Sequence, residues 1–395
     1  MYDVIVVGAR CGGSPAAMLL AQLGYRVLLL DRAGFPSDTV STHLVGLSGV
    51  ARLYRWGLEK KVASSGCPPI SRMTVRLGDA VFTGSPPAVD GIAHRYCVRR
   101  TVLDTILADA AVEAGAELRE GFVVREVLFD GDRVAGVRGR GASGREMEER
   151  ARLVVGADGL HSLVAEAVQA RRYSEHPALT WCCYAYWSGI DLDGSELHLA
   201  GRRAVAAIPT NDGLTCVSVA WPAAETGAFR ADGEANFTRT LGTLAPDLAA
   251  RVAAGSRVRA FVGTSDLPNF FRQPWGPGWA LVGDAGSCRD PLLAQGIADA
   301  FRDAELLAEA VDAGLGGGAD LDDALAGYEE GRNQAARPGY ELNARLASLE
   351  PLDEELAAWV RAAQQSQEET DRFLGVLAGA VPVPVGSVAF ITLDE

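Results

Sequence analysis

A glycine-rich turn directly after the first apolar run constrains the fold of this chain more than any other feature. The run Val4–Val7 is continuously apolar, as expected of a strand that is buried on both faces of a sheet. It leads into residues 8–13, Gly-Ala-Arg-Cys-Gly-Gly, and then into a segment with a helical pattern at residues 14–23. A second buried strand is expected at Arg26–Leu30, directly before Asp31. Strand, tight turn, helix and strand together predict a βαβ unit.

This unit has the layout of a dinucleotide-binding site. Glycines at these positions allow the tight turn and the close approach of helix to strand, and the free N–H groups of the helix N-terminus can bind a pyrophosphate. Asp31 is placed to accept hydrogen bonds from ribose hydroxyls. Arg10 stands where a second glycine is usual, and its side chain either contacts the phosphates or points to solvent. The expected cofactor contacts from this unit are Gly8, Arg10, Cys11, Gly12, Gly13, Asp31 and Arg32.

Two further turns follow apolar runs of the buried-strand type. Residues 155–159 read Val-Gly-Ala-Asp-Gly, and residues 281–285 read Leu-Val-Gly-Asp-Ala. The second turn continues through Pro291 to a helix expected from about Gly296 to Ala313. A glycine fingerprint, an Asp-Gly motif and a Gly-Asp motif therefore occur in that order along the chain, which is far more specific than any one of them.

With this ordered triplet, the chain resembles the group A flavoprotein monooxygenases, the p-hydroxybenzoate hydroxylase-like superfamily, which also contains geranylgeranyl reductases and flavin-dependent halogenases. The resemblance covers roughly residues 1–345 and implies that the chain binds FAD noncovalently. It implies that Asp284 binds the ribityl chain, that Arg100 lies beside the flavin or its phosphates, and that Asp158 organises the binding of FAD and of a pyridine nucleotide. It also places Pro291 against the flavin ring, with the N–H groups of three residues facing the pyrimidine edge: Gln295, Gly296 and Ile297.

The strand-rich block between the second and third motifs indicates an inserted domain. We therefore expect an α/β fold: a Rossmann-type FAD/NAD(P)-binding domain like that of p-hydroxybenzoate hydroxylase, an inserted β-sheet substrate domain and a C-terminal helical extension. The expected limits are residues 1–70, 94–172 and 263–345 for the FAD-binding domain, 71–93 and 173–262 for the substrate domain, and 346–395 for the extension.

Two kinds of side chain are candidates for the reaction centre. His43 falls where the superfamily places residues near the flavin, so it is a candidate catalytic acid or base, or else a loop histidine with a structural hydrogen bond. Pro291 is the other candidate. The aromatic stretch of residues 179–187 can present one face to helices of its own domain and the other to a substrate. The expected substrate wall is Trp181, Cys183, Trp187 and Phe270.

By resemblance, the leading function is an NAD(P)H-dependent FAD monooxygenase that hydroxylates an apolar, aromatic, secondary-metabolite-like substrate with molecular oxygen through a peroxyflavin. A reductase of carbon–carbon double bonds is the main alternative, with His43 as its proton donor. Halogenation is disfavoured, because the Gly-x-Trp-x-Trp-x-Ile-Pro motif is absent and the only lysines, Lys60 and Lys61, read as a helix end. Ala294 and Ala298 replace a glycine and an asparagine usual in the superfamily, which keeps open a non-catalytic flavin-binding or redox-sensing protein.

The net charge and the composition of the chain restrict which kinds of partner it can bind and where it can reside. A net charge of −14 argues against a nucleic-acid partner, since phosphate contacts need clustered Lys and Arg. No apolar run reaches the roughly 18 residues of a membrane span, and the chain starts directly with a strand rather than a signal peptide. The seven cysteines are scattered without ligand spacing, so no metal site is expected and the thiols are expected to be reduced. These features predict a cytoplasmic protein.

Overall fold

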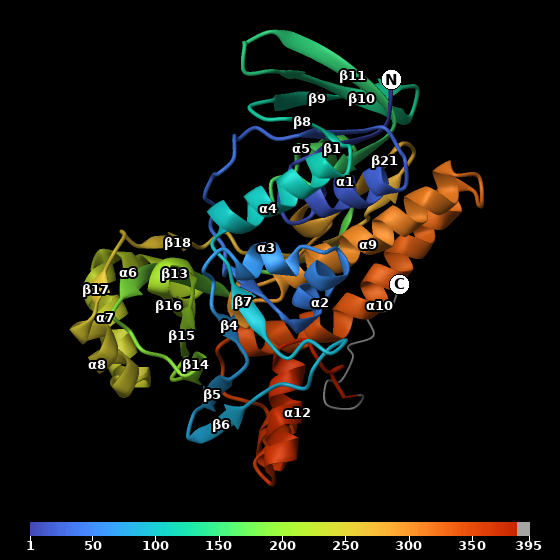
Figure 1. The fold of residues 1–395 in the computed structure, drawn as a ribbon. Helices are drawn as coiled ribbons and strands as arrows, with labels where there is room; N and C mark the ends of the chain where they lie inside the picture. Colours follow the sequence, from blue (N-terminus) through green and yellow to red (C-terminus); the bar gives the residue numbers. More distant parts are fainter. Residues whose placement is uncertain (385–395) are drawn as a thin grey trace.

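A computed structural model describes residues 1–384 and contains two large sheets joined by two small ones (Figure 1). The first large sheet has a parallel centre, in which β1 pairs with β2 on one side and β11 on the other. In spatial order its strands are β20 (Trp275–Gly276), β21 (Trp279–Leu281), β11 (Glu146–Gly156), β1 (Tyr2–Val7), β2 (Val27–Leu30) and β8 (Glu117–Arg119), with β10 (Arg133–Arg140) and β9 (Val123–Asp130) as an antiparallel extension of β11.

Both faces of this sheet are covered, which explains the uninterrupted apolar runs. Val4 and Val6 point into a core shared with α1 (Gly13–Gln22), α4 (Arg100–Glu113) and α9 (Gly296–Leu315). Ile5 and Val7 point into a second core, under α5 (Leu163–Ala167) and the β9–β10 hairpin. The βαβ prediction and the α/β fold class are confirmed.

The second large sheet is mostly antiparallel and lies beside the first in Figure 1. Helices α6 (Thr226–Ala231), α7 (Gly233–Leu244) and α8 (Pro246–Ala254) cover one of its faces. We propose that this sheet with its helices is the substrate domain. Its strands in order are β17 (Ser256–Arg257), β13 (Thr180–Ser188), β16 (Leu214–Pro222), β15 (Arg203–Pro209), β14 (Ser195–Ala200), β5 (Met73–Leu77) and β6 (Ala80–Gly84), with β18 (Val262–Thr264) also paired to β13.

Two three-stranded sheets connect these bodies. One has the order β3 (Leu44–Val45), β7 (Arg95–Cys97) and β4 (Pro69–Ile70). The other has the order β12 (Arg172–His176), β19 (Asn269–Arg272) and β22 (Ser287–Cys288). Helices α2 (Leu47–Arg55) and α3 (Glu59–Ala63) follow β3. Both β3 and α2 contact α9, so the chain packs against α9 before it enters the second large sheet at β5.

Within residues 1–384, three further helices lie after α9. The 27-residue α10 (Leu321–Ala347) packs along α9, and α11 (Glu354–Ala363) packs on α12 (Gln367–Leu377). Helix α12 in turn contacts β6, and an apolar cluster joins these helices to β5 and β6. The C-terminal helices thereby connect α9 with the β5–β6 edge of the second large sheet. No helix of residues 1–384 is long and apolar enough to cross a membrane.

Candidate FAD and substrate site

The three turn motifs lie side by side because they follow three neighbouring parallel strands, β1, β11 and β21. Their backbones are directly bonded: the Ala157 amide donates to the Val7 carbonyl at 2.8 Å, and the Val282 amide to the Gly156 carbonyl at 3.0 Å. The carboxyl edge of such a sheet is where dinucleotides bind in open α/β folds. The structure thus brings Gly8, Asp31, Asp158 and Asp284 to one edge.

Two glycines of the first motif, Gly8 and Gly13, are required by close packing. A Cβ atom on Gly13 would lie 1.8 Å from the Gly8 carbonyl oxygen, and one on Gly8, whose φ is +104°, would lie 2.3 Å from the Ala157 carbonyl oxygen. Gly12 is the N-cap of α1, and no side chain caps this helix. The Ser14 N–H already donates to the Arg10 carbonyl and Pro15 has no N–H, so the amides of Gly12 and Gly13 are the ones left for an anion, and the backbone here fits the pyrophosphate of FAD.

Asp31 is held rigidly at the end of β2. Its Oδ2 accepts a hydrogen bond from the Ala9 amide at 2.7 Å, and its Oδ1 accepts one from the Ala33 amide at 2.8 Å. The carboxylate has lone pairs left for a ribose hydroxyl, which fits the expected contact. The neighbouring Arg32 is exposed to solvent.

The guanidinium of Arg10 is bonded to two side chains of the protein. Its Nη1 donates to Asp104 Oδ2 at 2.6 Å and its Nη2 to Ser37 Oγ at 2.7 Å. The same buried Asp104 accepts from Arg100 Nε at 2.9 Å and from the Cys11 thiol at 3.4 Å. Asp104 therefore ties the glycine turn to α4. The sequence pointed to Arg100 in this segment but assigned no role to Asp104.

The carboxylate of Asp158 accepts hydrogen bonds from residues of its own loop. It accepts from the Ser162 hydroxyl and from the amides of Leu163 and Val164, which begin α5. Burial raises the pKa of Asp158, and these hydrogen bonds oppose the rise. Asp158 shapes the second turn rather than presenting a free carboxylate.

Asp284 differs, because its side chain is exposed at the edge of the sheet. The surrounding protein nevertheless raises its pKa by desolvation, while Arg100 opposes the rise. A small cavity beside Asp284 is bounded by Gly283, Ser287 and the first turn of α9. An accessible carboxylate next to a cavity suits hydrogen bonds from sugar hydroxyls, as expected for the ribityl chain.

The start of α9 is also built for an acceptor. Ala294, which stands where the superfamily has glycine, adopts a left-handed conformation with a φ of +53°. The helix that follows has no side-chain cap, Gly296 is exposed, and Ile297 anchors the turn in the core. Gln295 is fixed, with its Oε1 accepting from Arg289 and its Nε2 donating to the Leu377 carbonyl. Helix N–H groups in this arrangement fit the electron-rich edge of a flavin ring.

Pro291 opens the short turn before α9 and follows Asp290, which the sequence reasoning missed. Asp290 accepts from the Thr180 hydroxyl at 2.6 Å, and its backbone N–H donates to Asn269. Asn343 of α10 donates to the Asp290 carbonyl. Burial raises the pKa of Asp290 to about 6. The segment that carries Pro291 is thus held by three different elements.

A cavity of about 500 Å³ lies next to this segment. Its apolar walls come from the second large sheet, from β3 and the loop before α9, and from the end of α12 and the segment after it: Leu44, Met73, Leu197, Ile208, Leu292, Leu293, Leu377 and Val381. Its polar lining includes four arginines and Ser195. The volume is in the range of small-molecule sites.

His43 is fully buried beside the cavity but does not line it. Its Nε2 lies 2.6 Å from the Tyr186 hydroxyl, and its ring packs against Tyr184 and Tyr186. Burial and the nearby charge of Arg100 lower the pKa of His43 to about 4, so the imidazole is neutral at pH 7. This environment fits the structural alternative better than an acid–base role.

The expected substrate wall needs correction. Trp181, Cys183 and Trp187 point away from the cavity into the core under α6–α8, where they pack with Phe229 and Phe237. Phe270 is buried in β19, between the guanidinium groups of Arg172 and Arg272. None of these four residues lines the cavity. The alternation along β13 was correct, but only tertiary packing decides which face meets the helices.

Comparisons with known proteins agree with this geometry. The FAD binding domain family matches residues 1–340. Digeranylgeranylglycerophospholipid reductase of Methanosarcina acetivorans is 26% identical over 321 residues, which are 78% of this chain and 75% of that protein. The solved flavin-dependent brominase Bmp2 has a TM-score of 0.84 at 20% identity and covers 98% of this chain and 96% of its own. PqsL of Pseudomonas aeruginosa, described as a probable FAD-dependent monooxygenase, has a TM-score of 0.72 at 23% identity, with 95% and 99% covered.

The two structural likenesses show the fold, whereas the family match spans most of the chain. The resemblance inferred from the three motifs is confirmed. With the phosphate-binding turn, the three aligned motifs and this match together, the chain belongs to the FAD binding domain family and is an FAD-dependent oxidoreductase.

Proposed function

We propose that this protein is an NAD(P)H-dependent monooxygenase that hydroxylates a small, largely apolar molecule. The observation that carries the proposal is the cavity of about 500 Å³, which is bounded by apolar side chains and by the loop that leads into α9. A site of this kind binds and orients a small molecule while it excludes water from the reaction.

Different residues of the chain would bind FAD, stabilise its reduced form and bind the substrate. The N–H groups of α1 and the carboxylates of Asp31 and Asp284 would hold FAD, which when bound supplies the redox chemistry by passing electrons from NAD(P)H to molecular oxygen. The N–H groups at the start of α9 would stabilise negative charge on the reduced cofactor. The apolar cavity walls, to which residues 378–383 contribute, would position the substrate.

Double-bond reduction is the second candidate, favoured by the curated reductase that covers most of the chain. A reductase needs a proton donor facing its substrate. His43 was the residue considered for that task, and its burial, its bond to Tyr186 and its lowered pKa make it a poor donor. Halogenation is disfavoured, since Lys60 and Lys61 lie on α3, outside the cavity lining, and Lys61 pairs with Glu113.

The two candidates differ in what happens to oxygen. Purified protein would be supplied with FAD, NAD(P)H and ¹⁸O₂, and a set of aromatic and polyprenyl compounds would be screened for stimulation of NAD(P)H oxidation. A monooxygenase incorporates one ¹⁸O atom into the product, which mass spectrometry detects. Turnover without oxygen, with a product that gains two hydrogens, would replace the proposal by the reductase.

A further inference from the structure

The large cavity carries an arginine whose surroundings differ from those of its neighbours. Four arginines line this cavity: Arg52, Arg95, Arg289 and Arg302. A buried guanidinium is costly unless a carboxylate or another anion lies against it. The counterions of the four therefore show whether the cavity wall is electrically balanced.

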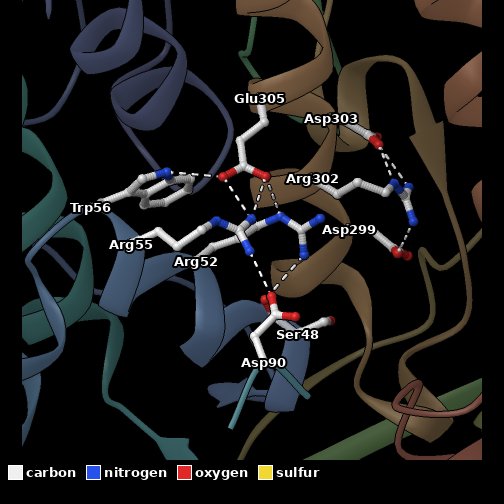
Figure 2. Close-up of polar contacts among 9 residues, drawn as sticks. All are labelled: Ser48, Arg52, Arg55, Trp56, Asp90, Asp299, Arg302, Asp303 and Glu305. Carbon is white, nitrogen blue, oxygen red and sulfur yellow. Dashed lines mark hydrogen bonds and ion pairs between the residues drawn. The ribbon is translucent and has the colours of Figure 1, made fainter. Parts of the chain in front are cut away.

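Three of the four are matched by carboxylates of the chain. Arg52 Nε lies 2.7 Å from Glu305, which also contacts Arg55 and Trp56 (Figure 2). Arg302 lies between Asp299 and Asp303, at 2.7 Å from each (Figure 2).

Asp299 also pairs with Arg289, at 2.5 Å. Two carboxylates, Asp299 and Asp303, thus face two arginines, Arg289 and Arg302. This part of the wall is balanced.

Arg95 has no such partner. It lies on β7 and is only 3% exposed, yet none of the carboxylates of residues 1–384 forms an ion pair with it. Its Nη2 donates only to neutral oxygens, the Ser195 hydroxyl at 3.0 Å and the Arg72 carbonyl at 3.4 Å. Burial lowers the pKa of Arg95 to about 10, so the side chain is still charged at pH 7.

The neighbouring groups do not supply the missing charge. Glu196 also lines the cavity, but its carboxylate bonds to Arg251 at 2.6 Å and to His198 at 3.1 Å. Ser195 accepts from Arg95, which leaves its own hydroxyl hydrogen free to donate. Arg95 and Ser195 together therefore present donors of hydrogen bonds to one region of the cavity.

We infer that the substrate carries a carboxylate, which Arg95 and Ser195 bind while the apolar body of the molecule occupies the rest of the cavity. A guanidinium matches a carboxylate in shape and charge, and such charge-assisted bonds are stronger than neutral ones. The inference rests on the proposed function in one respect, because it takes this cavity as the substrate site. It changes the expected substrate from a purely apolar compound to an amphipathic acid.

The test compares two probes of nearly equal shape, 2-naphthoate and 2-naphthamide, by isothermal titration calorimetry on the oxidised FAD-bound protein without NAD(P)H. The wild-type protein is expected to bind naphthoate at least about tenfold more tightly than naphthamide. Arg95→Met should reduce this ratio to about one, with FAD content unchanged. Arg76→Met removes an exposed arginine of β5 and is the matched control, which should keep the wild-type ratio.

Should Arg95→Met fail to retain FAD, Arg95→Lys and Ser195→Ala carry the test: the lysine variant should keep a preference for naphthoate, and Ser195→Ala should reduce it. Equal binding of both probes, no binding of naphthoate at millimolar concentration, or an unchanged ratio in Arg95→Met would overturn the inference. Displacement of naphthoate by millimolar bromide would instead identify an inorganic halide site and overturn it as well. Because no turnover is involved, these outcomes are independent of the oxygen-labelling result.

Discussion

Replacing Asp104 should expose how much the flavin site depends on one buried carboxylate. Asp104 is fully buried and neutralises two arginines, with Arg10 at 2.6 Å and Arg100 at 2.9 Å. Removing one partner of a buried ion pair costs about 3–5 kcal/mol. Because a quarter of the Arg10 side chain is exposed and can be resolvated, we expect about 3 kcal/mol for Asp104→Ala. FAD should also bind more weakly, since the glycine turn loses its tie to α4.

The assay is urea unfolding followed by the fluorescence of released FAD. With a slope of about 3 kcal/mol per molar urea, the midpoint should fall by about 1 M. Glu113→Ala is the matched control, because Glu113 lies on the same helix and forms an exposed pair with Lys61. Exposed pairs contribute about 0–1 kcal/mol, so its midpoint should move by about 0.3 M or less. Equal shifts in the two variants would refute the reasoning.

Two further predictions concern Asp284, in the third turn, and Asp290, in the segment that follows it. Asp284→Ala should weaken FAD binding by about tenfold or more in a fluorescence titration, because a charge-assisted hydrogen bond contributes about 1.5–3 kcal/mol. Asp266→Ala, in an exposed loop, is the control and should leave the affinity for FAD unchanged. An unchanged affinity in Asp284→Ala would contradict the contact with the ribityl chain. Asp290 has a folded pKa of about 6, above its ordinary value of 3.8, so the folded state holds this proton more tightly and stability falls as pH rises from about 4 through 6. In Asp290→Asn, the free energy of unfolding should decline by about 3 kcal/mol less over this pH range than in the wild type. Parallel curves of unfolding free energy against pH for variant and wild type between pH 4 and pH 7 would exclude this role of Asp290.

Local patterns along the chain were sufficient for the cofactor half of the site. A strand buried on both faces must be continuously apolar, and a turn that packs against a neighbouring strand must be glycine, so Val4–Val7 and the glycines at 8, 12 and 13 predict the βαβ unit without any tertiary information. The three motifs each follow such a strand. Their adjacency in space follows from the fold class that these patterns imply.

Properties that depend on distant parts of the chain could not be predicted in this way. Period-two alternation along β13 separates Trp181 from Tyr184, but nothing local shows that the tryptophan face meets α6–α8 and the tyrosine face meets His43. Likewise, the spacing around Arg10 does not reveal that its partner is Asp104, 94 residues away.

The substrate half of the site shows most clearly which features follow from local sequence and which depend on the tertiary structure. By itself, the sequence determined the Rossmann-type fold and the residues at the carboxyl edge of its sheet, because backbone geometry selects residue types over short ranges. Only the tertiary structure decided that Arg95 and Ser195, 100 positions apart, meet in the cavity and that no carboxylate of residues 1–384 forms an ion pair with Arg95. The charge balance of a buried group is a sum over every element packed around it, and that sum exists only once the chain has folded.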